Sequence, residues 1–193
     1  MKQFIESVVD SIVQSGLVEV EVSARHVHLT QEDVELLFGK GAVLHPKRPL
    51  SQPGQFLSEE RVTLIGPKGK KERVAVLGPV RKATQVELSI SDCVALGIKA
   101  PVRESEGPKG TLDASSAVIV ARANVHVPPQ VAAKLDLQDK ERVSVQIMTE
   151  RPVTFDNVVI RVSDQFRYKM HIDFDEANAA QVSGFTLGKI LKQ

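Results

Sequence analysis

The sequence of 193 residues has little of several residue types, and each scarcity limits what the protein can be. There is one cysteine, Cys93, and no tryptophan. A single cysteine excludes an internal disulfide and a zinc site made of cysteines, so any metal needs histidine and carboxylate ligands. Cys93 stands in SISDCVALG with no histidine nearby, which favours a small buried thiol over a nucleophile.

Charge of one sign and long apolar runs are also scarce. The net charge is +1, which gives no general reason to expect a nucleic-acid partner. No run approaches the roughly 20 apolar residues that span a bilayer. Glycine-rich phosphate loops, Gly-x-Ser-x-Gly elbows, Cys-x-x-Cys pairs and His-Glu-x-x-His helices are missing. We therefore expect a cytoplasmic protein that binds neither nucleic acid nor membrane.

Short segments with alternating apolar residues make up most of the chain. They predict a long strand over 17–29, a hairpin over 61–78 and further strands up to the C-terminus. Short helices are expected to begin at Thr30, Ser91, Pro129 and Asp173. Many short strands with brief helices between them predict a mainly β fold made of β-barrels. The polar segment 101–114 is the expected boundary between two halves.

The N-terminal segment 1–16 is predicted to be an amphipathic helix that ends at Gly16. Acidic Glu6 and Asp10 argue against a secretory signal. The apolar stripe could pack against the rest of the chain or dock onto a partner. We favour packing, because the connection to the next strand is short. The stripe consists of Phe4, Ile5, Val8, Val9, Ile12 and Val13.

Two of the five histidines, His26 and His28, stand two apart in SARHVHLT. In extended chain, residues two apart point to the same side. Two converging neutral imidazoles suit a transition metal, and the alternative is an exposed strand with incidental histidines. The segment ARANVHVPPQV echoes ARHVHLTQEDV, which indicates a weak internal repeat. The repeat puts Asn124 in place of His26 and His126 in place of His28.

Three further residues could belong to such a site. His171 lies on the predicted strand YKMHIDF. Arg81 and Glu87 lie in LGPVRKATQVELS, on a predicted turn and a predicted strand. A carboxylate with an arginine suits a metal site that handles an anion, although a solvated strand residue and a surface charge are the ordinary alternatives.

Six motifs together resemble the PduL family of phosphotransacylases, also called phosphate propanoyltransferases. They are SARHVHLT, PLSQPGQF, VTLIGPKG, VLGPVRKATQVELS, ALGI-x-x-PVR and MHIDFDEANAA, and the resemblance runs from about Val18 to near the C-terminus. It implies two β-barrel-like domains capped by short helices, each using strands distant in sequence. The expected halves are 17–105 and 106–193, with strand exchange between them. It also implies exchange of phosphate and coenzyme A on a short-chain acyl group, propanoyl or acetyl, at a dinuclear zinc site. A homodimer is implied, and so is an association with the shell or co-encapsulated enzymes in the lumen of a bacterial microcompartment.

The resemblance also assigns the site residues. One zinc ion would be bound by His26, His28 and Glu87, and the other by Asn124, His126 and His171. Arg81 would be the catalytic residue that binds phosphate, together with Ser105. The coenzyme A pocket would be bordered by Ser23, Arg48, Leu77 and Asn178.

Asn124 departs from the family pattern, which has Ala-Arg-x-His-x-His at the second motif. An amide oxygen is a weaker zinc ligand than an imidazole nitrogen, so the second zinc site is expected to be the weaker one.

Two other readings of the sequence are open. HVHLTQEDVELLFG fits the cupin pattern His-x-His-x₃-Glu-x₆-Gly, with Glu32 as third ligand, although Glu32 falls in a predicted helix. The second alternative is a non-catalytic barrel or scaffold subunit with structural metals. A cupin would not need coenzyme A, and a scaffold would turn over no thioester.

Overall fold

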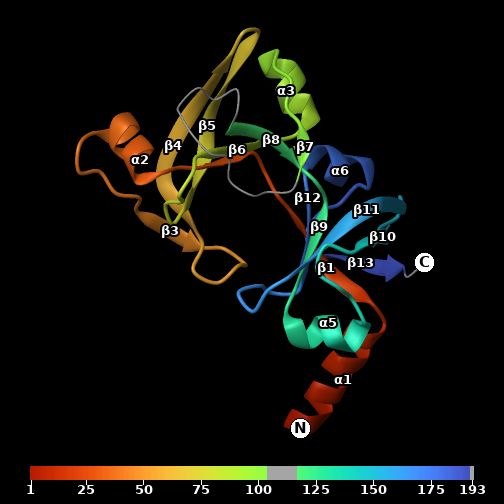
Figure 1. Ribbon diagram of the computed structural model, residues 1–193. Coiled ribbons are helices and arrows are strands. Elements are labelled where there is room, and N and C mark those ends of the chain that lie inside the picture. The colour runs from red at the N-terminus through yellow and green to blue at the C-terminus, as the bar shows by residue number, and fades with distance from the viewer. Residues whose placement is uncertain (104–116, 192–193) are drawn as a thin grey trace. The chain divides into compact units, whose positions relative to one another are not determined.

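The computed structural model describes residues 1–103 and 117–191 (Figure 1). The chain divides into two compact units. Unit 1 consists of Met1–Ser23 and Ala123–Gln193, and unit 2 of Ala24–Arg122. The first strand of the chain therefore belongs to the unit that the C-terminal half builds.

Unit 1 is a closed β-barrel with the strand order β1-β12-β9-β11-β10-β13. β1 runs parallel to β12 and antiparallel to β13, so the barrel joins the two ends of the described chain. Alternation places residues such as Val20 and Val145 in the core, and charged residues such as Glu19 outside it. The strands are β1 (Leu17–Val22), β9 (Asn124–Val127), β10 (Arg142–Met148), β11 (Val153–Val162), β12 (Lys169–Ile172) and β13 (Thr186–Leu191).

Three helices accompany the barrel: α1 (Lys2–Gln14), α5 (Pro129–Leu135) and α6 (Phe174–Ala179). Pro129 occupies the first turn of α5, where its missing N–H costs nothing. Asp173 and Glu176 form a reciprocal capping box at the start of α6. These starts confirm the helices that the sequence predicts at Pro129 and Asp173.

The packing predicted for α1 is wrong for most of its apolar stripe. α1 lies beside α5, where Asp10 and Lys134 form an ion pair of 2.6 Å (Figure 1). Val13 packs against the barrel core. Exposed side chains include Phe4, Ile5, Val8, Val9 and Ile12. Of this stripe, only Val13 at the C-terminal end of α1 reaches the barrel core, and the residues before it extend past the barrel into solvent.

Unit 2 is a seven-stranded sheet with the order β3-β4-β5-β2-β6-β8-β7. Its core includes Val27, Val76 and Val86, and Cys93 from α3. The strands are β2 (His26–His28), β3 (Pro46–Pro49), β4 (Phe56–Gly66), β5 (Gly69–Gly78), β6 (Gln85–Leu88), β7 (Val102–Arg103) and β8 (Val118–Ala121). The helices are α2 (Gln31–Phe38) and α3 (Ile90–Leu96). The predicted mainly β architecture with short helices is thus confirmed.

Local signals set the ends of the unit 2 helices. The Thr30 and Ser89 hydroxyls accept hydrogen bonds from the backbone N–H groups of Asp33 and Asp92, and so cap α2 and α3. Gly97 ends α3 in the left-handed region at φ 73°. β4 and β5 form the predicted hairpin, with Gly66 opposite Gly69.

The predicted single strand over 17–29 is corrected to two strands. β1 ends at Val22 in the barrel, and β2 begins at His26 in the sheet of unit 2. The burial pattern changes at the break, since β1 buries Val18 and Val20 whereas β2 buries all three of its residues. The sequence pattern alone gives no sign of this change of partner. Among the described residues, every helix is too short or too polar to span a membrane.

Candidate metal centre

His26, His28 and Glu87 meet on neighbouring strands of unit 2. β2 and β6 are antiparallel, with His26 opposite Glu87 and His28 opposite Gln85. One metal-ligating atom from each of the three residues lies within 4.8 Å of the others, and all three residues are buried. The His26 Nε2 atom is 3.6 Å from Glu87 Oε2, and the two imidazole rings stand perpendicular at 5.0 Å between centroids. Two imidazoles and a carboxylate around one point make a suitable donor set for zinc.

Backbone and side-chain contacts orient this triad. The Nδ1 atom of His26 is 2.8 Å from the Ala24 carbonyl oxygen. Because a carbonyl only accepts, Nδ1 carries a proton, and Nε2 is the nitrogen on the side of Glu87. The Gln85 amide donates a 2.5 Å hydrogen bond to Glu87 Oε1. Both histidine and carboxylate therefore have the outer partners that metal ligands need.

The pKa values of the two histidines shift in opposite directions. Burial, together with the charges of His26 and Arg81, lowers the pKa of His28 to about 2. His28 is therefore a neutral imidazole, which is the form that binds metals. Burial also lowers the pKa of His26, but attraction by Glu87 outweighs it and the pKa is raised. The carboxylate thus creates a preference for positive charge at this point.

A cavity of about 270 Å³ lies beside His28 of the triad. Arg81, which is distant from His28 in the sequence, lines the same cavity. Gly78 lines this cavity. A larger residue would not fit there, because a Cβ atom would lie 2.2 Å from the Phe56 ring. The turn 52–55 contributes residues that the sequence offered only as part of the motif PLSQPGQF. The lining consists of His28, Pro53, Gly54, Gln55, Gly78, Pro79 and Arg81.

Unit 1 carries a second group of predicted ligands on β9 and β12. His171 is the register partner of Asn124, and the rings of His126 and His171 are 4.5 Å apart between centroids. Phe166 stacks on His126 at 4.0 Å with an interplanar angle of 4°. The three predicted residues thus lie together on one barrel face, with an aromatic ring that the sequence analysis did not single out.

The remaining predicted residues lie at several places. Arg48 on β3 is exposed and pairs with Leu57, which in turn pairs with Leu77 on β5. The Ser23 backbone N–H donates to the Ile172 carbonyl in unit 1, and Asn178 is exposed on α6. Ser105 lies outside the described residues.

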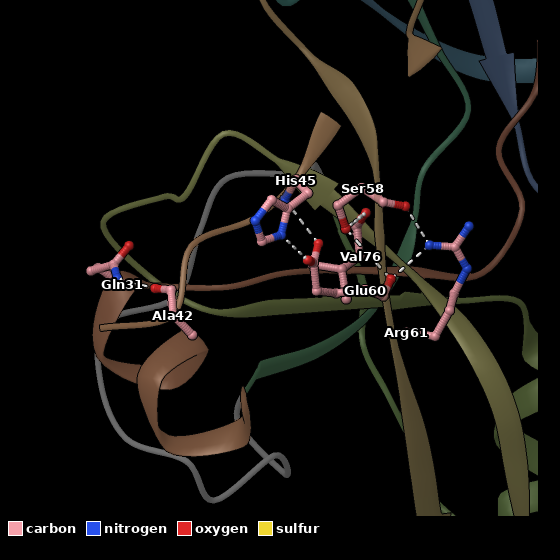
Figure 2. Close-up of polar contacts among 7 residues, drawn as sticks. All are labelled: Gln31, Ala42, His45, Ser58, Glu60, Arg61 and Val76. Carbon is pink, nitrogen blue, oxygen red and sulfur yellow. Dashed lines mark hydrogen bonds and ion pairs between the residues drawn. The ribbon is translucent and has the colours of Figure 1, made fainter. Parts of the chain in front are cut away.

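The remaining histidine, His45, has a separate role in unit 2. Figure 2 shows its ring turned to Glu60, with Nδ1 2.7 Å from Oε1 and the His45 backbone N–H donating to Oε2. Beside this pair, Arg61 donates to the carbonyls of Ser58 and Glu60. The Glu60 carboxylate raises the pKa of His45. These contacts hold the segment before β3 against β4. Arg48 lies on β3.

The cupin arrangement does not form. Glu32 is exposed on the first turn of α2, and the carboxylate that joins His26 and His28 is Glu87. The helix that begins after Thr30 turns Glu32 away from the strand. The triad therefore depends on pairing between β2 and β6 and not on one contiguous motif.

Comparison with known proteins gives a consistent family. A family model described as phosphate propanoyltransferase matches residues 19–183. The phosphate propanoyltransferase of Clostridioides difficile is 45% identical over 204 residues, covering 100% of this chain and 98% of that protein. The protein of the same name from Leptotrichia buccalis is 50% identical over 184 residues, with 90% and 87% covered. The one from Thermotoga maritima is 46% identical over 176 residues, with 85% and 84% covered.

Proposed function

Because the chain belongs to the phosphate propanoyltransferase family, an acyl-transferring class of enzyme, we propose that it exchanges coenzyme A and phosphate on a propanoyl or acetyl group at zinc ions. One observation carries the proposal above the others. His28, one member of the buried triad with His26 and Glu87, lines a cavity that Arg81 also lines. An electrophilic centre and an anion-binding fork beside one cavity suit a reaction between a thioester and phosphate.

The donor set of unit 2 fits a catalytic zinc ion. Catalytic zinc sites commonly use three protein ligands and keep a fourth position for water or substrate. Two imidazoles and one carboxylate meet that requirement, and His26 and Glu87 have outer partners in Ala24 and Gln85. Zinc bound there would polarise a thioester carbonyl or stabilise a leaving thiolate.

We assign a second zinc ion to Asn124, His126 and His171 of unit 1. The support is their shared barrel face and the short distance between the two imidazole rings. Asn124 offers an amide oxygen where zinc prefers nitrogen, so this ion is bound less tightly than the one in unit 2.

The chain's own groups bind and orient the reactants. The planar guanidinium of Arg81 holds phosphate through two parallel hydrogen bonds, with Ser105 as a further donor. A phosphate oxygen attacks the thioester carbonyl carbon and forms the new C–O bond. The C–S bond breaks, its electron pair leaves with the coenzyme A thiolate, and the acyl phosphate is released. In unit 2 the coenzyme A is bordered by Arg48 and Leu77, whose strands both pair with β4.

The test is zinc content and acyl-phosphate formation in variants of the triad. We expect His28→Ala and Glu87→Ala to lose about half of the bound zinc and most of the turnover, as loss of a metal ligand does. His45→Ala is the matched control, since it removes an imidazole of the same unit that pairs with Glu60. Unchanged zinc content in both triad variants would refute the assignment.

A weakened, metal-binding barrel is the second candidate, and Asn124 favours it. This candidate predicts normal zinc content in unit 2 with little conversion of propanoyl-CoA or acetyl-CoA. Measuring zinc and turnover on the same preparation separates the two candidates.

A further inference from the structure

A row of polar residues crosses three neighbouring strands of the unit 1 barrel. β1 pairs with β12 so that Glu21 lies opposite His171. β12 pairs with β9 so that His171 lies opposite Asn124. Cross-strand partners share one face of a sheet, so the three side chains stand side by side in one row.

This row lies on the outer face of the barrel. The adjacent row consists of Val20, Met170 and Val125, and all three belong to the barrel core. Since successive residues alternate between faces, Glu21 and His171 face outwards, with side chains 33% and 15% exposed. An acidic residue that no sequence motif singled out therefore borders the second predicted zinc site.

The contact between Glu21 and His171 involves a particular ring nitrogen. Glu21 Oε2 is 3.9 Å from His171 Nδ1. Nε2 lies on the other side of the ring from Nδ1. In His26 of unit 2, Nδ1 is within hydrogen-bond distance of the Ala24 carbonyl oxygen, at 2.8 Å, and Nε2 faces the triad. In both histidines the oxygen lies on the Nδ1 side, at hydrogen-bond distance in His26 and at ion-pair distance in His171.

Histidines that bind metals almost always donate their other N–H to a carboxylate or a carbonyl. That contact fixes the tautomer and makes the metal-binding nitrogen more basic. We propose that Glu21 is a positioning residue for the unit 1 zinc site: it holds the Nδ1–H of His171, so that Nε2 binds zinc, and offsets part of the weakness of the Asn124 amide. The inference rests on the proposed function, which supplies the second zinc ion.

Glu21 acts through His171 and is not itself a third ligand. Among the described residues, the one group of histidine, cysteine and acidic residues with ligand atoms within 4.8 Å of one another is His26, His28 and Glu87. Glu21, His126 and His171 do not meet that limit together. A carboxylate at ion-pair distance from one nitrogen can still orient the ring.

The same strand offers a matched control. Glu19 lies two residues earlier on β1, faces the same side and pairs with Lys169 at 2.8 Å. Glu19→Gln removes the same charge from the same strand without touching a histidine contact. A difference between the Glu19→Gln and Glu21→Gln variants therefore isolates the contact with His171.

The first experiment measures zinc affinity in the full-length chain. Zinc is titrated into zinc-free protein against a coloured chelator, in the His28→Ala background that removes the unit 2 site. We expect Glu21→Gln to weaken binding at the unit 1 site about 10- to 100-fold and Glu19→Gln to leave it unchanged. Equal affinity in the Glu21→Gln variant and its parent, or an equal loss in both variants, would overturn the inference.

A second measurement needs no substitution, so it holds even if Glu21→Gln fails to fold. Long-range ¹H–¹⁵N correlation spectra of the zinc-free chain report which nitrogen of His171 carries the proton. We expect the Nδ1–H tautomer, and the Nε2–H tautomer would overturn the inference. Wild-type protein that binds zinc at the unit 1 site, but with an affinity there that Glu21→Gln does not change, would refute this inference and leave the proposed function standing. Loss of all zinc in His28→Ala alone would refute the unit 1 site and leave the triad standing.

Discussion

The side-chain amide of Gln85 donates a 2.5 Å hydrogen bond to the carboxylate of Glu87, two residues further along β6. Gln85 is fully buried, and Glu87 is 8% exposed. Residues two apart on a strand share a face, so the amide stands directly beside the predicted ligand. Gln85 therefore holds one carboxylate oxygen and leaves the other towards His26.

This contact predicts that Gln85→Leu weakens zinc binding in unit 2. The two side chains have similar sizes, so the main loss is the hydrogen bond that orients Glu87. Outer partners of this kind are worth about 10- to 100-fold in metal affinity. Competition with a coloured chelator measures the change. An affinity within twofold of wild type would show that Gln85 does not orient the ligand.

Asn124→His should strengthen the unit 1 site. The substitution gives that site a third imidazole and restores the pattern of the first repeat. We expect zinc to rise towards two ions per chain and turnover to rise about tenfold. Elemental analysis and acyl-phosphate formation are compared between the two proteins. Two tightly held zinc ions in the asparagine form, or no gain in the histidine form, would contradict our view of Asn124.

Arg81→Lys should affect phosphate more than zinc. A lysine keeps the charge but cannot form two parallel hydrogen bonds, and the lost bond is worth about 1.5 kcal/mol, or roughly tenfold in affinity. The expected result is a raised KM for phosphate with unchanged zinc content. Initial rates at varied phosphate concentration test it, with the KM for acyl-CoA as internal control. An unaltered phosphate KM would remove Arg81 from the phosphate site.

Glu176 predicts a pH dependence of stability. Burial, together with repulsion by Asp173 and Asp175, raises the pKa of Glu176 to about 7. Because this pKa lies above that of the unfolded chain, the folded state binds more protons between about pH 4.5 and 7, and stability falls as pH rises through that window.

Glu176→Gln removes this proton uptake while keeping an oxygen that can accept the N–H of Asp173. We expect the variant to be more stable than wild type by on the order of 1 kcal/mol at pH 8, and nearly equal to it at pH 5. Urea unfolding of the zinc-free proteins at the two pH values gives the comparison. The same stability difference at both would exclude the titration of Glu176 as its cause.

Cys93→Ala should retain acyl transfer. The thiol is 5% exposed in the unit 2 core, and direct attack by phosphate needs no acyl-enzyme. Losing the small buried side chain costs about 1 kcal/mol of stability, so the variant is expected to fold. Its rate of acyl-phosphate formation should match that of wild type at a temperature where circular dichroism shows both folded. A folded variant without activity would contradict the direct mechanism.

The sequence by itself determined the local features of this protein. Thr30 and Asp173 cap their helices where the sequence predicts it, because capping involves groups only three residues apart. For α3 the sequence pointed to Ser91, and the observed cap is Ser89. The turn between β4 and β5 is local in the same way. The spacing of His26 and His28 likewise puts two imidazoles on one side of a strand whatever the strand pairs with. The resemblance to phosphate propanoyltransferases was also readable from contiguous motifs, and the family match confirms it.

Only the tertiary structure decided which strands become neighbours. The segment 17–29 reads as one strand, yet its first half closes a barrel and its second half enters another sheet. The exposed stripe of α1 is a second case, because an amphipathic pattern does not say which surface it meets. The predicted homodimer and the association with a microcompartment shell stay predictions.

The metal ligands show the same division most clearly. Spacing offered Glu32 as the carboxylate beside His26 and His28, and the family resemblance named Glu87. The antiparallel register between β2 and β6 is the physical reason that Glu87 stands there, with Gln85 beside it. Register also sets Glu21 against His171, although the two lie at opposite ends of the chain. The pairing of strands far apart in sequence depends on how whole sheets pack around their cores. The sequence of a single strand does not specify which strand lies next to it.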